Sequence, residues 1–198
     1  MSSSAVQVPV AATRRHLSAR QARTVHKLTE AAVAELVDHG YPALTVRSVA
    51  KRAGVAPATA YTYFGSKEHL VAEVFWRRFE AQAPRPLDRR RSPATRATDV
   101  LLDFALVVAE ETDLSAACTV AMLADDAEVR ELRMRIGLEL RRRLLDALGD
   151  DATPIVVQTL ELATSGALLQ VGTGHLDYAA IPGLLADVAH LTLAGARP

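Results

Sequence analysis

Hydrophobic residues recur at helical intervals along almost the whole chain, and no stretch alternates as a β-strand would. The first helical stripe consists of Val25, Leu28, Ala32 and Leu36. It follows Ser18 and Gln21, whose spacing is that of a capping box at the start of a helix. Gly40 ends this pattern. The spacing therefore predicts a first helix from Ser18 to about residue 40.

Three further helices are predicted next. Thr45 begins a helix that spans 45–53, and Gly54 follows it in the manner of a left-handed cap. A second helix over 57–64 begins with a proline, whose missing N–H is harmless at the first helical position. Ser66 caps the third of these helices.

The segment 83–94 interrupts the pattern with three prolines and four arginines, so it cannot be the interior of a regular helix. Beyond it the periodicity resumes, and helices are predicted over 92–112, 114–124, 126–148, 153–174 and 177–195. Arg141, Arg142 and Arg143 are consecutive and are expected to spread around a solvated helix surface. The fold class is therefore all-α.

Composition adds a charge asymmetry that the zero net charge hides. Residues 1–83 hold 11 Lys and Arg against 6 Asp and Glu, whereas residues 84–198 hold 12 against 17. A basic first part is typical of a module that meets polyanions. The single cysteine, Cys118, excludes an internal disulfide and is expected to be a small buried residue. No uninterrupted run of 18 apolar residues is present, so we expect no membrane span and a cytoplasmic protein.

The helices 45–53 and 57–64, joined by a turn that contains Gly54, have the pattern of a helix-turn-helix. In that motif the second helix enters the major groove of DNA. At about 100° per residue, Ala60 and Phe64 share the buried direction of this helix. The opposite face carries small or hydroxyl-bearing residues, and two tyrosines lie on its flanks.

This arrangement suits a groove. Ala58 lets the backbone approach the bases, and Thr59 and Thr62 can bond base edges or contact a thymine methyl group. Tyr61 and Tyr63 can reach the phosphates on either wall. An ordinary short helix in a bundle is the alternative that spacing alone leaves open.

The stretch TVRSVAKRAGVAPATAYTYFGSKEHLVAEV, residues 45–74, closely resembles the DNA-binding signature of the TetR family of bacterial transcriptional regulators. The resemblance extends back to Ser18 and covers about residues 18–80. It implies a homodimer that binds a palindromic DNA operator, with a second domain that dimerises and binds a small-molecule effector. The implied protein is a repressor that this effector releases from DNA.

The break at 83–94 marks a domain boundary or at least a long loop between helices, and together with the resemblance it predicts a domain plan. A flexible arm over 1–17 precedes a three-helix helix-turn-helix DNA-binding domain over 18–82. A helical ligand-binding and dimerisation domain then occupies 83–198.

Position by position, the resemblance assigns DNA contacts to Thr45, Arg47, Thr59, Tyr61, Tyr63 and Lys67, with Pro57, Ala58 and Thr62 at positions that vary with the operator. The chain departs from the family pattern at two places. Ala56 stands where the family often has a capping serine, which removes a contribution of about 1 kcal/mol. Ala60 replaces a larger aliphatic residue, so the helix is expected to lie closer to its neighbour.

The second domain supplies candidates for a ligand pocket and a dimer face. If the implied cavity is present, its expected wall is Leu101, Phe104, Val107, Val108, Cys118, Met122, Leu138 and Leu168. This apolar wall indicates a hydrophobic or amphipathic effector. The last two helices carry small residues and an apolar stripe suited to a two-fold interface. The predicted interface residues are Leu162, Ser165, Gly166, Leu169, Leu184, Leu185, Val188 and Leu191.

Other signals point to no catalytic chemistry. The glycine-containing stretch 171–177 follows a helix rather than a strand, which favours a helix end over a dinucleotide site. His175 and Asp177 lack a third metal ligand, so no metal or cofactor is expected. Arg14 in the arm could enter a minor groove or be part of a solvated tail. The alternative function is an all-α small-molecule-binding or catalytic protein whose first domain no longer binds DNA.

Overall fold

The structure, a computed structural model, describes residues 18–196, and within that range all regular secondary structure is helical. The α-helices are α1 (Ala19–Ala43), α2 (Val46–Arg52), α3 (Pro57–Tyr61), α4 (Lys67–Ala81), α5 (Pro93–Ala105), α6 (Thr112–Met122), α7 (Ala127–Leu148), α8 (Pro154–Gly172) and α9 (Ile181–Gly195). Two 3-10 helices, η2 (Gly149–Asp151) and η3 (Tyr178–Ala180), precede α8 and α9. The all-α prediction is confirmed. The predicted arm over 1–17 lies outside the described residues.

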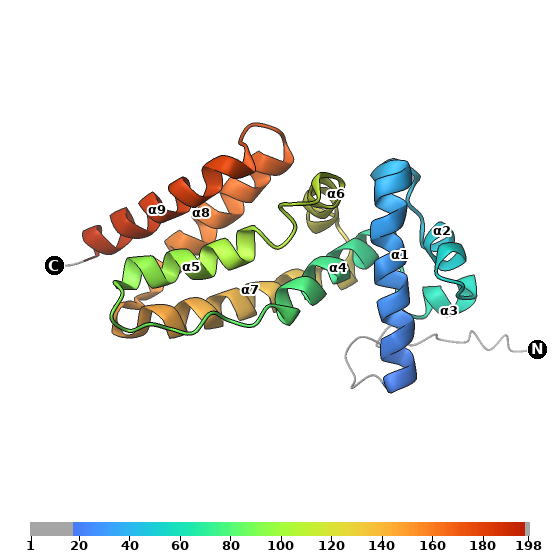
Figure 1. Ribbon diagram of the computed structural model, residues 1–198, viewed down its shortest axis with the longest axis horizontal. Coiled ribbons are helices and arrows are strands. Elements are labelled where there is room, and N and C mark those ends of the chain that lie inside the picture. Colours follow the sequence, from blue (N-terminus) through green and yellow to red (C-terminus); the bar gives the residue numbers. More distant parts are fainter. Residues whose placement is uncertain (1–17, 197–198) are drawn as a thin grey trace, which may run out of the picture.

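The helices gather in two regions (Figure 1). The head consists of α1, α2 and α3 at one end of the molecule. The bundle consists of α5 to α9, of which α5, α7, α8 and α9 run along the other end. Helix α4 extends from the head into the bundle and packs against α1 on one side and against α6 and α7 on the other.

The predicted helix starts in the head are confirmed by their caps. The side chains of Ser18, Thr45 and Ser66 each accept a hydrogen bond from the N–H three residues later, at 3.3, 3.0 and 3.0 Å. Gly54 has a φ of 65°, the left-handed conformation that a helix end of this kind requires. These local signals place α2, α3 and α4 in sequence with tight turns between them.

The predicted break at Gly40 is confirmed, because its φ of 73° and ψ of 167° are not helical, and a short helical segment after this kink extends α1 to Ala43. Two other predicted helix ends were wrong. Helix α3 ends at Tyr61 rather than residue 64, and α5 ends at Ala105 rather than residue 112. After α5, the chain forms turns until Glu111, whose carboxylate pairs with Arg78 of α4. This contact between distant segments accompanies the early end of α5, where local helix propensity alone favoured continuation.

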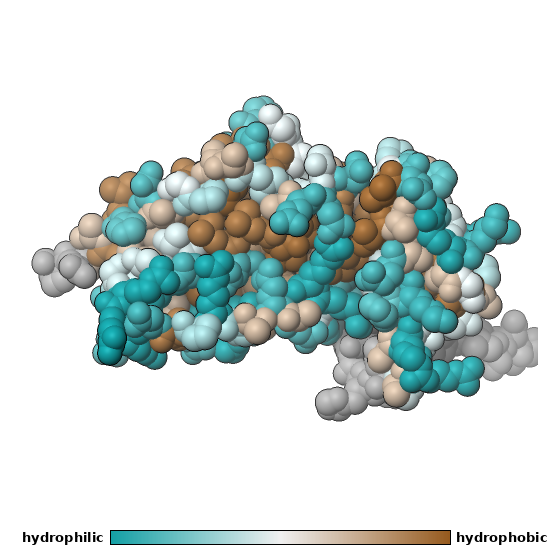
Figure 2. Space-filling model, viewed as in Figure 1, coloured by the Kyte–Doolittle hydropathy of each residue, from teal (hydrophilic) through white to brown (hydrophobic). Residues whose placement is uncertain are grey.

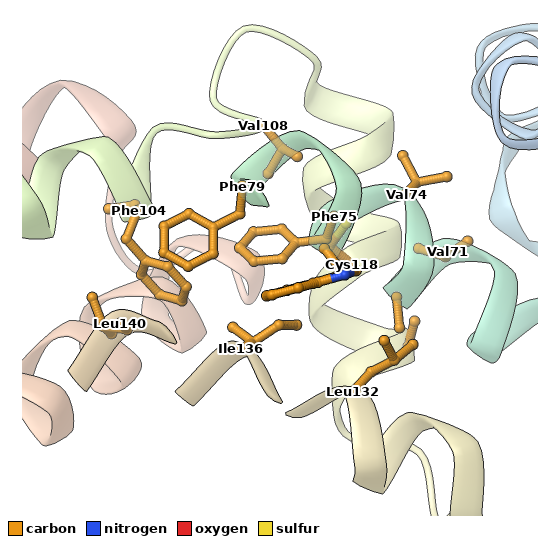
Figure 3. Close-up of a cluster of buried hydrophobic side chains, with 14 of the residues drawn as sticks. Val71, Val74, Phe75, Phe79, Phe104, Val108, Cys118, Leu132, Ile136 and Leu140 are labelled. Atoms are coloured by element: carbon orange, nitrogen blue, oxygen red, sulfur yellow. The ribbon is translucent and has the colours of Figure 1, made fainter. Parts of the chain in front are cut away.

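The aromatic residues of α4 fill the centre of the bundle (Figure 3). The rings of Phe75 and Phe79 meet Phe104 of α5 edge to face, with centroids 5.5 and 5.0 Å apart. The same helix contributes Leu70 to the buried residues nearer the head. Helix α4 therefore packs against residues of both regions. The division into two domains between residues 82 and 83 remains a prediction.

The three consecutive arginines of α7 do not form a solvated surface as expected. Arg141 and Arg142 are exposed, but Arg143 is buried. Its guanidinium lies 4.2 Å from the centroid of Phe79 and donates to the backbone oxygen of Phe79 at 3.1 Å. Glu139 accepts from Arg143 Nε at 2.8 Å, which compensates the buried charge.

Candidate functional site

Helix α3 is held by a small number of buried residues. Ala60 and Phe64 are both 0% exposed, which confirms the direction that the spacing predicted. Phe64 lies after the helix, but its N–H still donates to Ala60 O at 3.0 Å, so the chain keeps winding and the side chain keeps its inward direction. The ring of Phe64 meets the ring of His69 edge to face at 5.4 Å. One face of α3 is thereby fixed against the start of α4.

The other face of α3 is exposed. Pro57, Ala58, Thr59 and Thr62 are exposed, Tyr61 is 51% exposed, and Tyr63 is half-buried. The Thr62 hydroxyl donates to Thr59 O at 2.7 Å, which leaves this hydroxyl as an acceptor for a partner. The face therefore presents small groups and hydroxyl groups around a backbone that a partner can approach.

The start of α3 lacks a side-chain cap, as the sequence predicts. Ala56 occupies the capping position with φ −60° and ψ 134° and makes no side-chain bond to the helix. Pro57 is the first helical residue. The proline's fixed φ favours helix entry and its missing N–H leaves one orphan donor fewer at this end.

The remaining predicted DNA-contact residues flank α3. Thr45 and Arg47, at the start of α2, are exposed, and Arg47 makes no ion pair with any other described residue. Lys67 is half-buried, and its ammonium donates to Tyr41 O at 3.1 Å and lies 4.3 Å from the Tyr41 ring centroid. An ammonium has three N–H donors, so this bond leaves others for a further acceptor.

An ion pair joins α2 to α1 in the head. Arg52, the last residue of α2, donates through Nε to Glu35 of α1 and also bonds Asp38. Glu35 is buried, so its charge is compensated by the Arg52 guanidinium. Sequence reasoning missed this pair because it joins residues 17 positions apart whose contact depends on how α1 and α2 cross.

A cavity of about 580 Å³ lies in the bundle. Its inner wall comes from Phe75 of α4, Phe104 of α5, Cys118 of α6 and Ile136 of α7, which meet in one cluster (Figure 3). Its opening lies between α7 and α8, where Leu138 and Ser165 are exposed. A volume of this size suits a small organic ligand.

Six of the eight residues predicted for the cavity wall line it: Phe104, Val108, Cys118, Met122, Leu138 and Leu168. Leu101 is fully buried and Val107 half-buried, and neither contributes to the wall. Sequence reasoning missed Phe75 because it lies on α4, which the domain plan assigned to the DNA-binding part.

The polar groups of the cavity are few and mostly paired. Ser115 Oγ and Tyr178 Oη are hydrogen-bonded at 2.7 Å, and Arg141 holds Glu161 through two bonds of 2.9 and 2.6 Å. Burial raises the pKa of the Cys118 thiol to about 12, so this side chain remains a protonated, unreactive thiol. Among residues 18–196, no group of His, Cys, Asp and Glu is arranged to hold a metal ion.

Helices α8 and α9 expose large apolar side chains. Leu162 and Leu191 are 66% and 74% exposed, and Leu169 and Leu184 are also exposed. Ser165 and Gly166 lie among them, and Val188 is half-buried. Leu185 is the exception, because it is 0% exposed and belongs to the buried core of its own chain. It therefore leaves the predicted interface.

By length and composition alone, Pro154–Gly172 and Tyr178–Gly195 pass the test for membrane-spanning helices. Core helices of soluble proteins pass the same test, so this is weak evidence for a membrane. Within this chain only 28% and 22% of the two stretches are buried, and Leu162 and Leu191 are among their exposed apolar residues. Hydrophobic residues also gather in the middle of the face drawn in Figure 2, above a hydrophilic lower edge.

A hydrogen bond joins the start of α4 to the start of α7. Ser66 Oγ donates to Asp126 Oδ2 at 2.7 Å, while Asp126 Oδ1 caps α7 by accepting from the N–H groups of Glu128 and Val129. Partial burial works to raise the pKa of Asp126, but the bonds from Ser66 and from the two backbone N–H groups hold it below its usual value. The carboxylate thus stays charged and connects the head to a wall of the cavity.

Comparisons with known proteins agree with this arrangement. The family model for bacterial regulatory proteins, tetR family, matches residues 28–74, from within α1 to within α4. An uncharacterized HTH-type transcriptional regulator of Mycobacterium tuberculosis is 48% identical over 180 residues, which cover 90% of this chain and 84% of the relative. The HTH-type transcriptional repressor KstR of Rhodococcus jostii is 30% identical over 125 residues, or 63% of this chain and 59% of KstR.

Solved structures share the fold. The crystal structure of a TetR transcriptional regulator from Rhodococcus sp. RHA1 has a TM-score of 0.71 and 24% identity, covering 85% of this chain and 97% of that one. The regulator FadR from Bacillus subtilis, solved in complex with stearoyl-CoA, has a TM-score of 0.54 and 20% identity over 86% of this chain and 98% of that one.

Proposed function

The chain belongs to the tetR family of bacterial regulatory proteins and is a transcriptional regulator rather than an enzyme; from that premise we propose that it is a repressor that binds a palindromic operator as a homodimer and leaves it when a small, mostly hydrophobic effector binds. The observation that carries the proposal is the exposed face of α3. A repressor among the relatives, KstR, supports the direction of control.

The proposed reading of DNA divides the face between two tasks. Thr59, Thr62 and Ala58 meet base edges, since they are exposed and small enough for close approach. Tyr61 and Lys67 contact phosphates and fix the register without reading sequence. The bond from Lys67 to Tyr41 O orients the ammonium at the N-terminus of α4, where backbone N–H groups also favour a phosphate.

The proposed dimer forms through α8 and α9. Four helices, two from each copy, would cover the exposed leucines, and such an interface has two-fold symmetry. A two-fold dimer presents two α3 helices to two half-sites, which is why a palindromic operator is expected. The revised face contains Leu162, Ser165, Gly166, Leu169, Leu184, Val188 and Leu191.

The proposed effector binds in the cavity between α4 and α8. The wall is mainly apolar and the volume of about 580 Å³ fits a drug-sized molecule. FadR, which has the same fold, was solved with stearoyl-CoA, a ligand with a long apolar chain. Movement of α6 or α7 around an effector would act on Asp126 and, through its bond to Ser66, on α4 and Phe64 beneath α3.

A gel-shift experiment tests the DNA-binding half. The probe is the region upstream of the gene for this chain, titrated with wild type, Tyr61→Phe, Lys67→Ala and the control Lys51→Ala across a salt series. We expect both contact variants to bind every sequence several-fold more weakly, with the salt slope of Lys67→Ala reduced by about 1. Lys51 is exposed at the end of α2 outside the proposed contacts, so Lys51→Ala should match wild type.

Equal binding by Tyr61→Phe, Lys67→Ala and wild type would refute the contact assignment. Absence of a shift with this probe and with a pool of genomic fragments would instead favour the small-molecule-binding protein without DNA function.

Binding of Nile red, a fluorescent apolar dye, tests the effector half. We expect wild type to bind the dye, and Met122→Trp, which fills the cavity, to bind it at least tenfold more weakly. Val120→Trp is the matched control, because Val120 lies on the same helix, is 54% exposed and lines no described cavity. Dye binding that survives Met122→Trp would place the dye elsewhere and remove the support for an effector cavity.

A further inference from the structure

A second hollow, the outer groove, adjoins the effector cavity. It has a volume of about 480 Å³ and lies between the start of α6 and the segment that joins α8 to α9. Three of its polar residues, Thr112, His175 and Asp177, are exposed. The outer groove is thus more polar than the cavity and reaches solvent.

Ser115 and Tyr178 line both the cavity and the outer groove. Their hydroxyl groups are bonded to each other at 2.7 Å, so this pair forms part of the wall between the two hollows. Next to it, Gly172 of α8 packs against Thr119 of α6 so tightly that a Cβ atom at Gly172 would lie 2.1 Å from Thr119 Oγ1. The wall is therefore tightly packed beside the Ser115–Tyr178 pair.

Ser115 and Tyr178 differ in how firmly the surrounding structure holds them. Ser115 is 6% exposed within α6. Tyr178 is half-buried and begins the three-residue helix η3, after a loop in which Gly174 has a φ of 76°. A short surface segment can be displaced at a lower cost than a buried helix position. Tyr178 is therefore the side of the wall that can move.

A hydrogen bond at this point can be exchanged. The Ser115 side chain is buried, so its hydroxyl must keep a hydrogen-bond partner, whereas the Tyr178 side chain is half-buried. The net contribution of one hydrogen bond to stability is only about 1 kcal/mol. A ligand that offers its own donor or acceptor between Ser115 and Tyr178 would satisfy both groups in place of their mutual bond. An apolar pair would have closed the wall without this possibility.

We propose that the outer groove is a second subsite of the effector site, which holds the uncharged, hydrogen-bonding end of an amphipathic molecule whose apolar body fills the cavity. This inference rests on the proposed effector cavity. The Ser115–Tyr178 hydrogen bond closes the passage between the two subsites. This bond breaks when the ligand binds across both subsites. The other opening of the cavity lies beside Ser165 and Leu169, which belong to the proposed dimer face, so a second copy would restrict it.

Competition against Nile red tests the proposal with two ligands that share a 12-carbon tail. Glycerol monolaurate has an uncharged head with two hydroxyl groups, and methyl laurate has no hydrogen-bond donor. Both are used below their aggregation concentrations with the full chain. In wild type we expect glycerol monolaurate to displace the dye at about tenfold lower concentration than methyl laurate.

Ala116→Trp fills the outer groove without reaching the cavity, because Ala116 is exposed and lines only the groove. We expect this variant to bind Nile red and methyl laurate as wild type does and to lose the tenfold advantage of glycerol monolaurate. Val120→Trp, one turn further along α6, should keep that advantage. Thr112→Trp fills the same groove from another position and should repeat the result if Ala116→Trp does not fold.

Equal competition by the two ligands in wild type would overturn the second subsite, as would an advantage that survives in both tryptophan variants of the groove. In those cases dye binding still supports the cavity. Failure of wild type to bind Nile red would remove the effector cavity of the proposed function, and the second subsite with it.

Discussion

Helices α3 and α8 both expose one face, but the two faces differ in kind. Helix α3 has five residues and exposes alanine, proline, threonine and tyrosine around a single buried position, Ala60. Helix α8 has 19 residues and exposes Ile155, Leu162 and Leu169. The first face can remain in water when no partner is bound, whereas the second is a large apolar surface of the kind that marks an interaction site.

The difference shows how one chain can use two kinds of surface, one proposed to bind DNA and one proposed to bind a second copy of the chain. A five-residue helix contributes too little buried surface to hold itself, so α3 depends on α2 and on Phe64, which contacts His69 of α4, for its position. A long helix with apolar residues on several faces can pack against its own bundle and against a second copy together. Substitutions in the two regions test this contrast between α3, which neighbouring residues hold in place, and α8, which is proposed to hold two subunits together.

The largest effect is expected from Phe64→Ala, which removes the main anchor beside α3. Phe64 is fully buried, and loss of such a side chain costs about 3–5 kcal/mol. Urea unfolding followed by circular dichroism would measure the loss. Tyr61→Ala, on the exposed face, should change the free energy of unfolding by no more than about 0.5 kcal/mol while weakening DNA binding. Similar unfolding curves for the two variants would contradict the anchoring role.

The double variant Leu162→Glu with Leu191→Glu should break the dimer. Each charge would be buried twice in a two-fold interface, so we expect the dimer dissociation constant to rise about 100-fold, or about 2.7 kcal/mol. Sedimentation equilibrium measures this, and operator binding should fall with it. Val37→Glu is the control, since Val37 is 63% exposed on α1 in the head. A double variant that sediments as wild type would exclude α8 and α9 as the interface.

A smaller effect is expected from Thr62→Val, which keeps the shape and removes the hydroxyl. Since that hydroxyl donates to Thr59 O, it can only accept from DNA, and adenine and cytosine present the matching amino groups in the major groove. We expect the preference at one base pair to weaken by about 1 kcal/mol. Selection of bound sequences from a randomised pool would measure it. An unchanged selected sequence would show that Thr62 does not read a base.

The smallest effects come from helix caps and should be opposite in the two regions. Ala56→Ser adds a cap to α3 and should stabilise the head by about 0.5–1 kcal/mol. Thr153→Ala removes the cap that accepts from Val156 N at 3.4 Å and should destabilise the bundle by a similar amount. Thermal unfolding measures both changes. An unchanged unfolding temperature in Ala56→Ser would mean that Pro57 already orients the helix start fully.

Local signals explain why the head was predictable. Capping side chains three residues before their partners, Gly54 in a turn and Pro57 at a helix start all act within a few residues, so they can be identified along the sequence. The inward direction of Ala60 and Phe64 followed from helical spacing alone. The DNA contacts assigned by resemblance remain predictions, although most of those residues are exposed in the structure.

The bundle was less predictable because its apolar residues have several possible directions. Leu184 and Leu185 are adjacent apolar residues, yet one is exposed and the other is fully buried. Arg143 looks like its two neighbours in sequence but stacks on Phe79, a residue of another helix. Spacing describes one helix at a time, whereas these outcomes depend on which neighbour that helix meets.

The sequence by itself determined the helical fold, the motif of α2 and α3, and the apolar character of the second half, because each follows from periodicity and local capping. Only the tertiary structure decided that α4 contributes Phe75 to the cavity, that Ser66 bonds Asp126, and that Ser115 and Tyr178 close a wall between two hollows. Those pairs lie 60 and 63 positions apart. Such contacts arise when packed helices bring distant segments together, and no local rule specifies that packing.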